Sequence, residues 1–189
     1  DASYMESVSL ALERGAFGVF DWEKEKDNDF IKSLPKNIRE KIKQFGRRNI
    51  SILTNAPTGS VSILSQTSSG LEPVFRNSYV RRRKLSHDEK SVKADFVDEL
   101  GDKWLEYDVF HHNVQEWCDL NEKDPTKDEI PDIFVESSEI DWQKRIEVQA
   151  AIQKNIDHSI SSTINLPKDT SPSVVAELYM LGWKLGLKG

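Results

Sequence analysis

Ala56-Pro57-Thr58-Gly59-Ser60-Val61-Ser62 is the stretch on which the interpretation of this chain depends. An apolar segment (50–53) precedes it and a second apolar segment (61–64) follows it. This order predicts a strand, a tight Pro/Gly turn and the first turn of a helix. The first backbone N–H groups of a helix lack intrahelical partners and carry partial positive charge. The stretch therefore predicts an anion site in which a glycine and small hydroxylated residues let a phosphate approach the backbone.

The same pattern has a second interpretation that the residues leave open. Clusters of Ser, Thr and Gly between a strand and a helix are also typical of ordinary helix caps and turns. The glycine-rich phosphate signatures G-x-x-x-x-G-K-[ST] and G-x-G-x-x-G are absent from the sequence. From spacing alone, a phosphate site and a structural turn both remain possible.

Length and charge restrict the class of protein. A chain of 189 residues suggests one domain or part of one. Its 26 basic and 32 acidic residues give a net charge of −6, which argues against nucleic acid and anionic membranes as partners. The sequence has no apolar run of 18 residues and no basic-then-apolar leader, so we expect a soluble, cytoplasmic protein.

Apolar periodicity and capping residues predict a mostly helical chain with a few strands. We expect helices over 4–14, 35–45, 108–120, 141–156 and 171–185, and strands over 50–54 and 159–166. On the first helix we expect one apolar face, made of Met5, Val8, Ala11 and Leu12. On the second we expect Ile38, Ile42 and Phe45 to face inward. The charged segment 22–30 is predicted to be a loop, and residues 76–137 an irregular surface excursion.

Several segments resemble the large chains of ribonucleotide reductases, in the order in which that family has them. Residues 49–62 resemble the family's phosphate-binding strand and helix start, and residues 69–75 resemble the Gly-Ile-Glu-Pro stretch that follows. Residues 156–167 resemble a landmark near the C-terminus of the barrel, and residues 178–189 the helix that leads into the last strand. Ala-Pro-Thr-Gly and Ile-Asn-Leu-Pro are similar to the adenosylcobalamin-dependent class, whereas the iron-dependent class usually has a Pro-Ser-Glu-Thr-type loop.

The resemblance implies a fold and a reaction. The family fold is a ten-stranded α/β barrel, and residues 1–189 would form its C-terminal portion, a partial catalytic barrel domain. The family replaces the ribose 2′-hydroxyl with hydrogen by radical chemistry. The implied partners are a ribonucleotide substrate, the remaining N-terminal part of the barrel and a dithiol reductant such as thioredoxin, and the implied cofactor is adenosylcobalamin.

The residues that the resemblance assigns to substrate-phosphate binding are Pro57, Thr58, Gly59, Ser60, Val61 and Ser62. No catalytic residue and no metal ligand is assigned. The family's finger-loop cysteine motif and redox cysteine pair are absent, and Cys118, the single cysteine, matches neither. We therefore expect the chain to need the missing part of the barrel for nucleotide reduction.

Four other features each allow a functional and a structural interpretation. Cys118 follows His111 and His112 and is either an inert thiol or part of a metal site. The basic cluster 81–84 either contacts a nucleotide or a neighbouring subunit, or is simply solvated. The pair Asp157–His158 has the form of an oriented base but precedes a predicted strand. Glu72 either accepts backbone N–H groups of the phosphate loop or faces the substrate.

Two alternatives to a reductase fragment also stay open. The chain could be a stand-alone, non-catalytic module that binds nucleotides or phosphate. It could also be a structural subunit in which residues 57–62 bind nothing.

Overall fold

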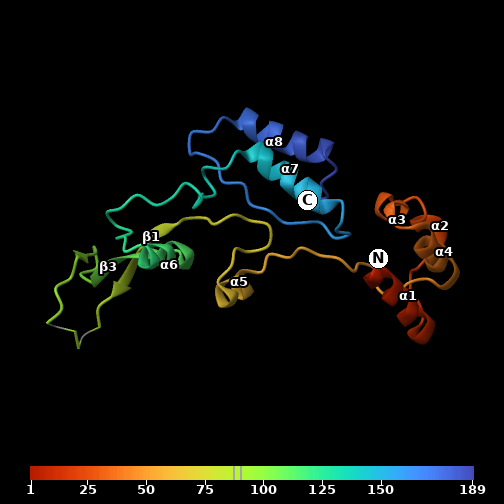
Figure 1. Cartoon of the computed structure of the whole chain (residues 1–189), viewed down its shortest axis with the longest axis horizontal. Helices are drawn as coiled ribbons and strands as arrows, with labels where there is room; N and C mark the ends of the chain where they lie inside the picture. The colour runs from red at the N-terminus through yellow and green to blue at the C-terminus, as the bar shows by residue number, and fades with distance from the viewer. Residues whose placement is uncertain (87, 90) are drawn as a thin grey trace. The chain divides into compact units, whose positions relative to one another are not determined.

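The computed structural model describes residues 1–86, 88–89 and 91–189. The described part of the chain contains helices and one sheet, which agrees with the expected mixed α/β class (Figure 1). The elements in chain order are α1 (Ala2–Arg14), α2 (Trp22–Glu25), α3 (Asp29–Ser33), α4 (Lys36–Phe45), α5 (Gly59–Ser65), β1 (Ser78–Lys84), β2 (Phe96–Val97), β3 (Lys103–Phe110), α6 (His112–Leu120), α7 (Trp142–Gln153) and α8 (Pro172–Lys184). They belong to two compact units, which are described separately: residues 1–59 with 141–189, and residues 60–140.

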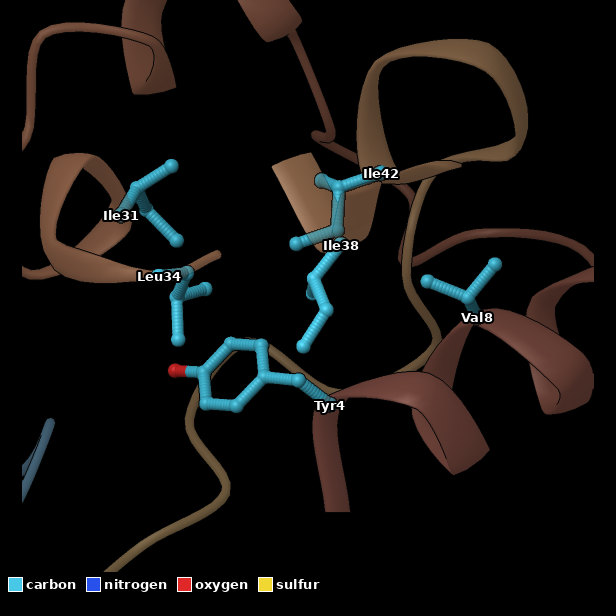
Figure 2. Close-up of a cluster of buried hydrophobic side chains, with 6 residues drawn as sticks. All are labelled: Tyr4, Val8, Ile31, Leu34, Ile38 and Ile42. Atoms are coloured by element: carbon cyan, nitrogen blue, oxygen red, sulfur yellow. The ribbon is translucent and has the colours of Figure 1, made fainter. Parts of the chain in front are cut away.

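The hydrophobic core of the first unit lies where α1 packs against α4. Figure 2 shows its six buried side chains, which are Tyr4, Val8, Ile31, Leu34, Ile38 and Ile42. Within each of the two long helices the buried residues are four positions apart, which places them on one face. Each fully buried side chain of this size contributes about 1.5–3 kcal/mol of burial free energy.

The expected long helices of this unit are confirmed, with small shifts at their ends. The α1 helix ends at Gly15, and Gly46 (φ 75°) ends α4. The Asp141 carboxylate caps α7 by accepting two backbone N–H groups. However, Phe45 is exposed, so the expectation that it faces inward is wrong. Leu12 is 63% exposed, whereas Val8 and Ala11 of the same expected face are buried.

The prediction of a loop over residues 22–30 is wrong. Two short helices lie there, α2 and the start of α3, and each begins at a side chain that caps it. Asp21 accepts the N–H of Glu23, and Asn28 accepts the N–H groups of Phe30 and Ile31. Helices of four and five residues are too short to show an apolar period, so the periodicity argument could not detect them.

The strands predicted over 50–54 and 159–166 are not strands in this structure. Both segments lie outside regular secondary structure, and the described strands are three antiparallel ones elsewhere. A strand is defined by a ladder of hydrogen bonds to a neighbouring strand. Beside the second segment, the His158 N–H donates to the Leu53 carbonyl of the first at 3.2 Å, and one such bond does not make a ladder. The ten-stranded barrel therefore stays a prediction.

The second unit contains a three-stranded antiparallel sheet in the order β1-β3-β2. The register pairs Ser78 with Phe110 and Lys84 with Trp104. The expectation of an irregular segment over 76–137 is thus wrong for the residues of β1, β2 and β3. The helix expected from residue 108 begins at His112, because residues 108–110 belong to β3. Residues 121–137 contain no helix or strand, as expected. Among the helices of the described residues, none has the length and apolar character needed to cross a membrane.

Candidate functional site

The predicted phosphate-binding residues lie in one short stretch of chain at the start of α5. Pro57 and Thr58 precede the helix, and Gly59 is its first residue, where a helix start was predicted. Ser60 and Val61 are exposed in the first turn, whereas Ser62 is buried. The stretch therefore has an accessible helix start, as an anion site requires, and Ser62 is less accessible than its neighbours.

Gly59 is not required by the fold. A Cβ added to it would meet nothing within 4 Å, and its φ lies outside the left-handed region. The absence of a side chain at this position leaves open the surface next to the first N–H groups of α5. This makes Gly59 a position at which close approach of a ligand can be tested without disturbing the chain.

The segment that leads into this stretch is bound by the carboxylate of Asp157. Asp157 Oδ2 accepts the N–H of Ile52 and Oδ1 accepts the N–H of Leu53, both at 2.8 Å. Asp157 Oδ2 also accepts the Tyr4 hydroxyl at 2.5 Å. The backbone N–H of His158 in turn donates to the Leu53 carbonyl at 3.2 Å. Both N–H and C=O of Leu53 are thus bonded to residues more than a hundred positions away in the chain.

Arg47 binds the backbone of the same segment at Asn49 and Ile50, before the two residues that Asp157 binds. Its Nη1 donates to the carbonyl of Asn49 at 2.6 Å and to that of Ile50. Its Nε and Nη2 donate to the Glu25 carboxylate at 3.0–3.2 Å. The side chain is only 7% exposed, and its guanidinium lies 5.2 Å from the Phe17 ring centroid. The ion pair with Glu25 offsets the cost of burying this charge.

We call residues 49–53 the anchored segment. Its backbone is hydrogen-bonded to a positively charged side chain near one end and to a negatively charged side chain near the other. Its first two carbonyls accept from Arg47, and the N–H groups of its last two residues donate to Asp157. Buried or half-buried backbone groups need such partners when no ladder supplies them. These bonds explain how the segment stays ordered without being part of a sheet.

Two glutamines of α7 bind the chain on either side of Asp157. Gln153 Nε2 donates to the carbonyls of Ile156 and His158 at 2.9 and 2.8 Å. Gln149 Nε2 donates to the carbonyl of Ile160 at 2.9 Å. Both glutamine side chains are buried. The position of Asp157 is thereby determined by α7 and not only by its own contacts.

Burial and the neighbouring Asp157 carboxylate raise the pKa of the Tyr4 hydroxyl well above its ordinary value. The burial effect is the larger of the two. Tyr4 therefore stays protonated and remains a hydrogen-bond donor to Asp157 over the whole physiological pH range. The sequence offered no signal for this contact, because the two residues are 153 positions apart.

The interpretation of Asp157 and His158 as an oriented base is not supported by their geometry. The Asp157 oxygens accept from Tyr4 and from two backbone N–H groups, and the His158 side chain is exposed. The structural interpretation of this pair is the one that agrees with the structure.

The basic cluster 81–84 lies on β1, where three of its four side chains are in ion pairs. Arg82 binds Glu106 at 2.6 Å, Arg83 binds Glu89 at 2.7 Å and Lys84 binds Asp102 at 2.5 Å. All four residues are exposed. This arrangement favours a solvated, internally neutralised strand over a nucleotide contact.

Cys118 is buried in α6, and burial raises the pKa of its thiol. His111 and His112 stack on one another with ring centroids 4.3 Å apart, and His111 Nδ1 accepts the N–H of Asn113. The described residues contain no group of three or more His, Cys, Asp or Glu able to bind a metal ion. The geometry therefore favours an inert thiol. The role of Glu72, whose N–H donates to the Ser69 carbonyl at 3.0 Å, stays a prediction.

Comparison with known proteins gives a consistent assignment. The family model described as the ribonucleotide reductase barrel domain matches residues 1–189. A vitamin B12-dependent ribonucleoside-diphosphate reductase of Thermoplasma acidophilum is 31% identical over 192 residues, which cover 100% of this chain and 22% of the relative. A protein of the same description from Mycobacterium tuberculosis (strain CDC 1551) is 28% identical over 188 residues, covering 100% of this chain and 25% of the relative.

A ribonucleoside-diphosphate reductase subunit alpha of Helicobacter pylori (strain J99) is 27% identical over 202 residues, with 96% of this chain and 22% of the relative covered. The chain thus spans about a fifth to a quarter of the length of these curated relatives. Since the family model covers every residue of it, the chain belongs to the ribonucleotide reductase barrel-domain family.

Proposed function

We propose that residues 1–189 are part of a ribonucleotide reductase and that residues 57–62 bind the phosphates of its ribonucleotide substrate. The observation that carries this proposal is the match of the whole chain to the barrel-domain family. The exposed start of α5, with a glycine at its first position, supports the assignment of the phosphate site. Because the three relatives described above are named ribonucleoside-diphosphate reductases or a subunit of one, a ribonucleoside diphosphate is the first substrate to test.

In the proposed enzyme, the ribose 2′-hydroxyl is replaced by hydrogen through radical chemistry. The role of residues 57–62 is binding and orientation: they place the ribose against reacting groups that lie in the rest of the barrel. The electrons come from a dithiol reductant such as thioredoxin and enter through a cysteine pair outside residues 1–189, because the single cysteine of this chain cannot form a dithiol. We further propose that the chain forms the C-terminal portion of the ten-stranded barrel and acts in the cytoplasm.

The proposed cofactor is adenosylcobalamin, since three similar proteins are named as vitamin B12-dependent. The described residues do not fit a site for it. A cavity of about 450 Å³ in the first unit is lined mainly by apolar side chains of α8 and the 162–166 segment, and the adjacent histidines of α6 stack on each other. In this proposal the cobalamin is bound by parts of the reductase outside residues 1–189, where it supplies the radical.

A pair of matched glycine variants tests the phosphate site. Gly59→Val places a side chain beside the first N–H groups of α5, in space that is open in the structure. Gly18→Val is the control, because Gly18 is also exposed, has no left-handed φ and has nothing within 4 Å of an added Cβ. The measurements are the KM of the natural full-length protein for a ribonucleoside diphosphate and the thermal unfolding midpoint of each variant.

We expect Gly59→Val to raise the KM about tenfold or more, with an unfolding midpoint close to that of the unmodified protein. Gly18→Val should change neither quantity. An unchanged KM in Gly59→Val would contradict the phosphate site. The alternative of a stand-alone binding module has no support in the comparisons, as the Thermoplasma, Mycobacterium and Helicobacter relatives are reductases or a reductase subunit.

A further inference from the structure

We propose that Asp157 is a positioning residue for the phosphate-binding stretch. Its carboxylate determines the path of the anchored segment, and through it the position of residues 57–59, the part of the stretch that belongs to the same compact unit as Asp157. The inference rests on the proposed function, since it assigns to Asp157 a role in that same site. Asp157 itself is not proposed to touch the substrate.

The first argument is that the hydrogen-bonding capacity of the Asp157 carboxylate is directed at the anchored segment. One oxygen accepts the N–H of Leu53, and the other accepts the N–H of Ile52 together with the Tyr4 hydroxyl. Hydrogen bonds to an ionised acceptor are about twice as strong as neutral ones. The carboxylate therefore fixes two consecutive peptide units at a single place.

The second argument is that Asp157 is itself rigidly placed. The Gln153 side chain binds the carbonyls on both sides of it, at 156 and 158. The Lys188 ammonium donates to the Asp157 carbonyl at 2.7 Å. A side chain held by its own backbone contacts can transmit its position to the segment it binds.

The third argument is the short chain distance between the bonded residues and the proposed site. Three residues separate Leu53 from Pro57, and the ring of Pro57 restricts both its own φ and the conformation of Ala56. Few freely rotating bonds thus lie between the carboxylate and the start of α5. In this proposal a change at Ile52 or Leu53 displaces residues 57–59, so the substrate phosphates bind less tightly.

The variant Asp157→Asn removes this positioning with little change in shape. An amide has one acceptor oxygen, so its NH₂ group must face either the Ile52 or the Leu53 N–H. The NH₂ group can donate to Tyr4 in one of these orientations, and then the Ile52 N–H loses its partner. The variant therefore releases at least one backbone N–H of the anchored segment.

Two variants separate positioning from a general loss of stability. Tyr4→Phe removes the hydroxyl donor but leaves both backbone N–H groups bound to Asp157. Val114→Ala shortens a buried side chain of α6 in the unit formed by residues 60–140, whereas Asp157 and the anchored segment belong to the other unit. It therefore lowers stability without changing the core against which Ile52 and Leu53 pack, and it is the control for destabilisation alone.

The experiment measures KM and kcat for a ribonucleoside diphosphate in the natural full-length protein, alongside Gly59→Val. We expect Asp157→Asn to raise KM about tenfold, and Tyr4→Phe and Val114→Ala to leave KM within about twofold. A merely structural role would reduce the folded fraction, which lowers kcat per total protein at unchanged KM. The split between the two constants therefore distinguishes the two roles.

Each outcome bears on one proposal or on both. If Gly59→Val raises KM but Asp157→Asn lowers only kcat, the positioning role is wrong and the phosphate site stands. If Gly59→Val leaves KM unchanged, the phosphate site is wrong and the positioning role is wrong with it. If Asp157→Asn does not fold, Asp157→Glu decides by the same comparison, because it keeps the charge but displaces the carboxylate by one methylene.

Discussion

At the scale of single residues, the structure depends on charged side chains that bind the backbone. Arg47 donates hydrogen bonds to carbonyl oxygens of the anchored segment, and Asp157 accepts hydrogen bonds from its N–H groups. Removing one partner of such a buried network leaves the other groups unsatisfied, which is why these side chains matter more than surface charges do. Gly46, which precedes Arg47, allows the chain to turn from α4 into this network.

Gly46→Ala is expected to destabilise the protein more than Gly15→Ala. Both glycines end a helix with similar positive φ (75° and 78°) in a region that other residues avoid, which costs about 1–3 kcal/mol in either variant. An added Cβ at Gly46 would also lie 2.6 Å from the Ala16 Cβ, whereas at Gly15 it would meet nothing within 4 Å. Urea unfolding of both variants measures the difference, and equal losses would show that the contact with Ala16 relaxes freely.

At the scale of elements, short sequence patterns and tertiary contacts determine different things. The long helices have apolar periods and caps that operate locally. The β1–β3 pair instead combines strands rich in charged residues, and one ion pair, Arg82–Glu106, joins the two strands. Lys84 at the end of β1 binds Asp102, the residue before β3. A strand of this kind has no alternating apolar pattern, so periodicity could not reveal it.

The end of β1 provides a pH-dependent contact. Hydrogen bonds from Arg83, and then from the backbone N–H of Ser86, lower the pKa of the Glu89 carboxyl from 4.5 to about 2. Because the folded pKa is depressed, the stabilisation from this contact is complete above about pH 4.5 and is lost as the pH falls toward 2. NMR titration of the Glu89 carboxyl should give a midpoint near 2.

The variant Arg83→Gln should move that midpoint upward toward the ordinary value of 4.5. Arg81→Gln is the matched control on the same strand and should leave the midpoint unchanged. A Glu89 midpoint that does not respond to Arg83→Gln would contradict the assignment of Arg83 as the main cause.

At the scale of the whole molecule, the chain leaves apolar side chains in contact with solvent. On α8, Tyr179 and Trp183 are 74% and 72% exposed and lie four positions apart, on one face of the helix. A helix with an exposed apolar face is usually covered by another part of a protein. This agrees with a chain that spans about a fifth to a quarter of its relatives' length.

We expect residues 1–189 on their own to bind the dye ANS through this face. Trp183→Ser should lower the ANS fluorescence, because it removes the largest exposed ring of α8. Leu12→Ser is the control, since Leu12 is also exposed but lies on α1, away from this face. An equal decrease in both variants would mean that the dye does not bind preferentially to α8.

The sequence by itself determined the family, the mixed α/β class and the positions of α1, α4, α7, α8 and the start of α5. These features rest on local information: caps, apolar periods over one helix face, and short motifs at residues 49–62, 69–75, 156–167 and 178–189. The candidate phosphate-binding residues come from the segment 49–62 and not from any distant contact.

Only the tertiary structure decided how the chain that leads into those residues is bound. The contacts of Asp157 join it to Tyr4, Ile52 and Leu53, which are 104 to 153 positions away in the sequence. Such contacts leave no periodic pattern or fixed spacing in the sequence. The same hydrogen bonds can form whatever the number of residues between the partners, as long as the chain brings them together. The predicted strands are absent for a related reason, since a strand exists only when a neighbouring strand supplies its ladder of hydrogen bonds. Side chains bind the backbone of the anchored segment instead.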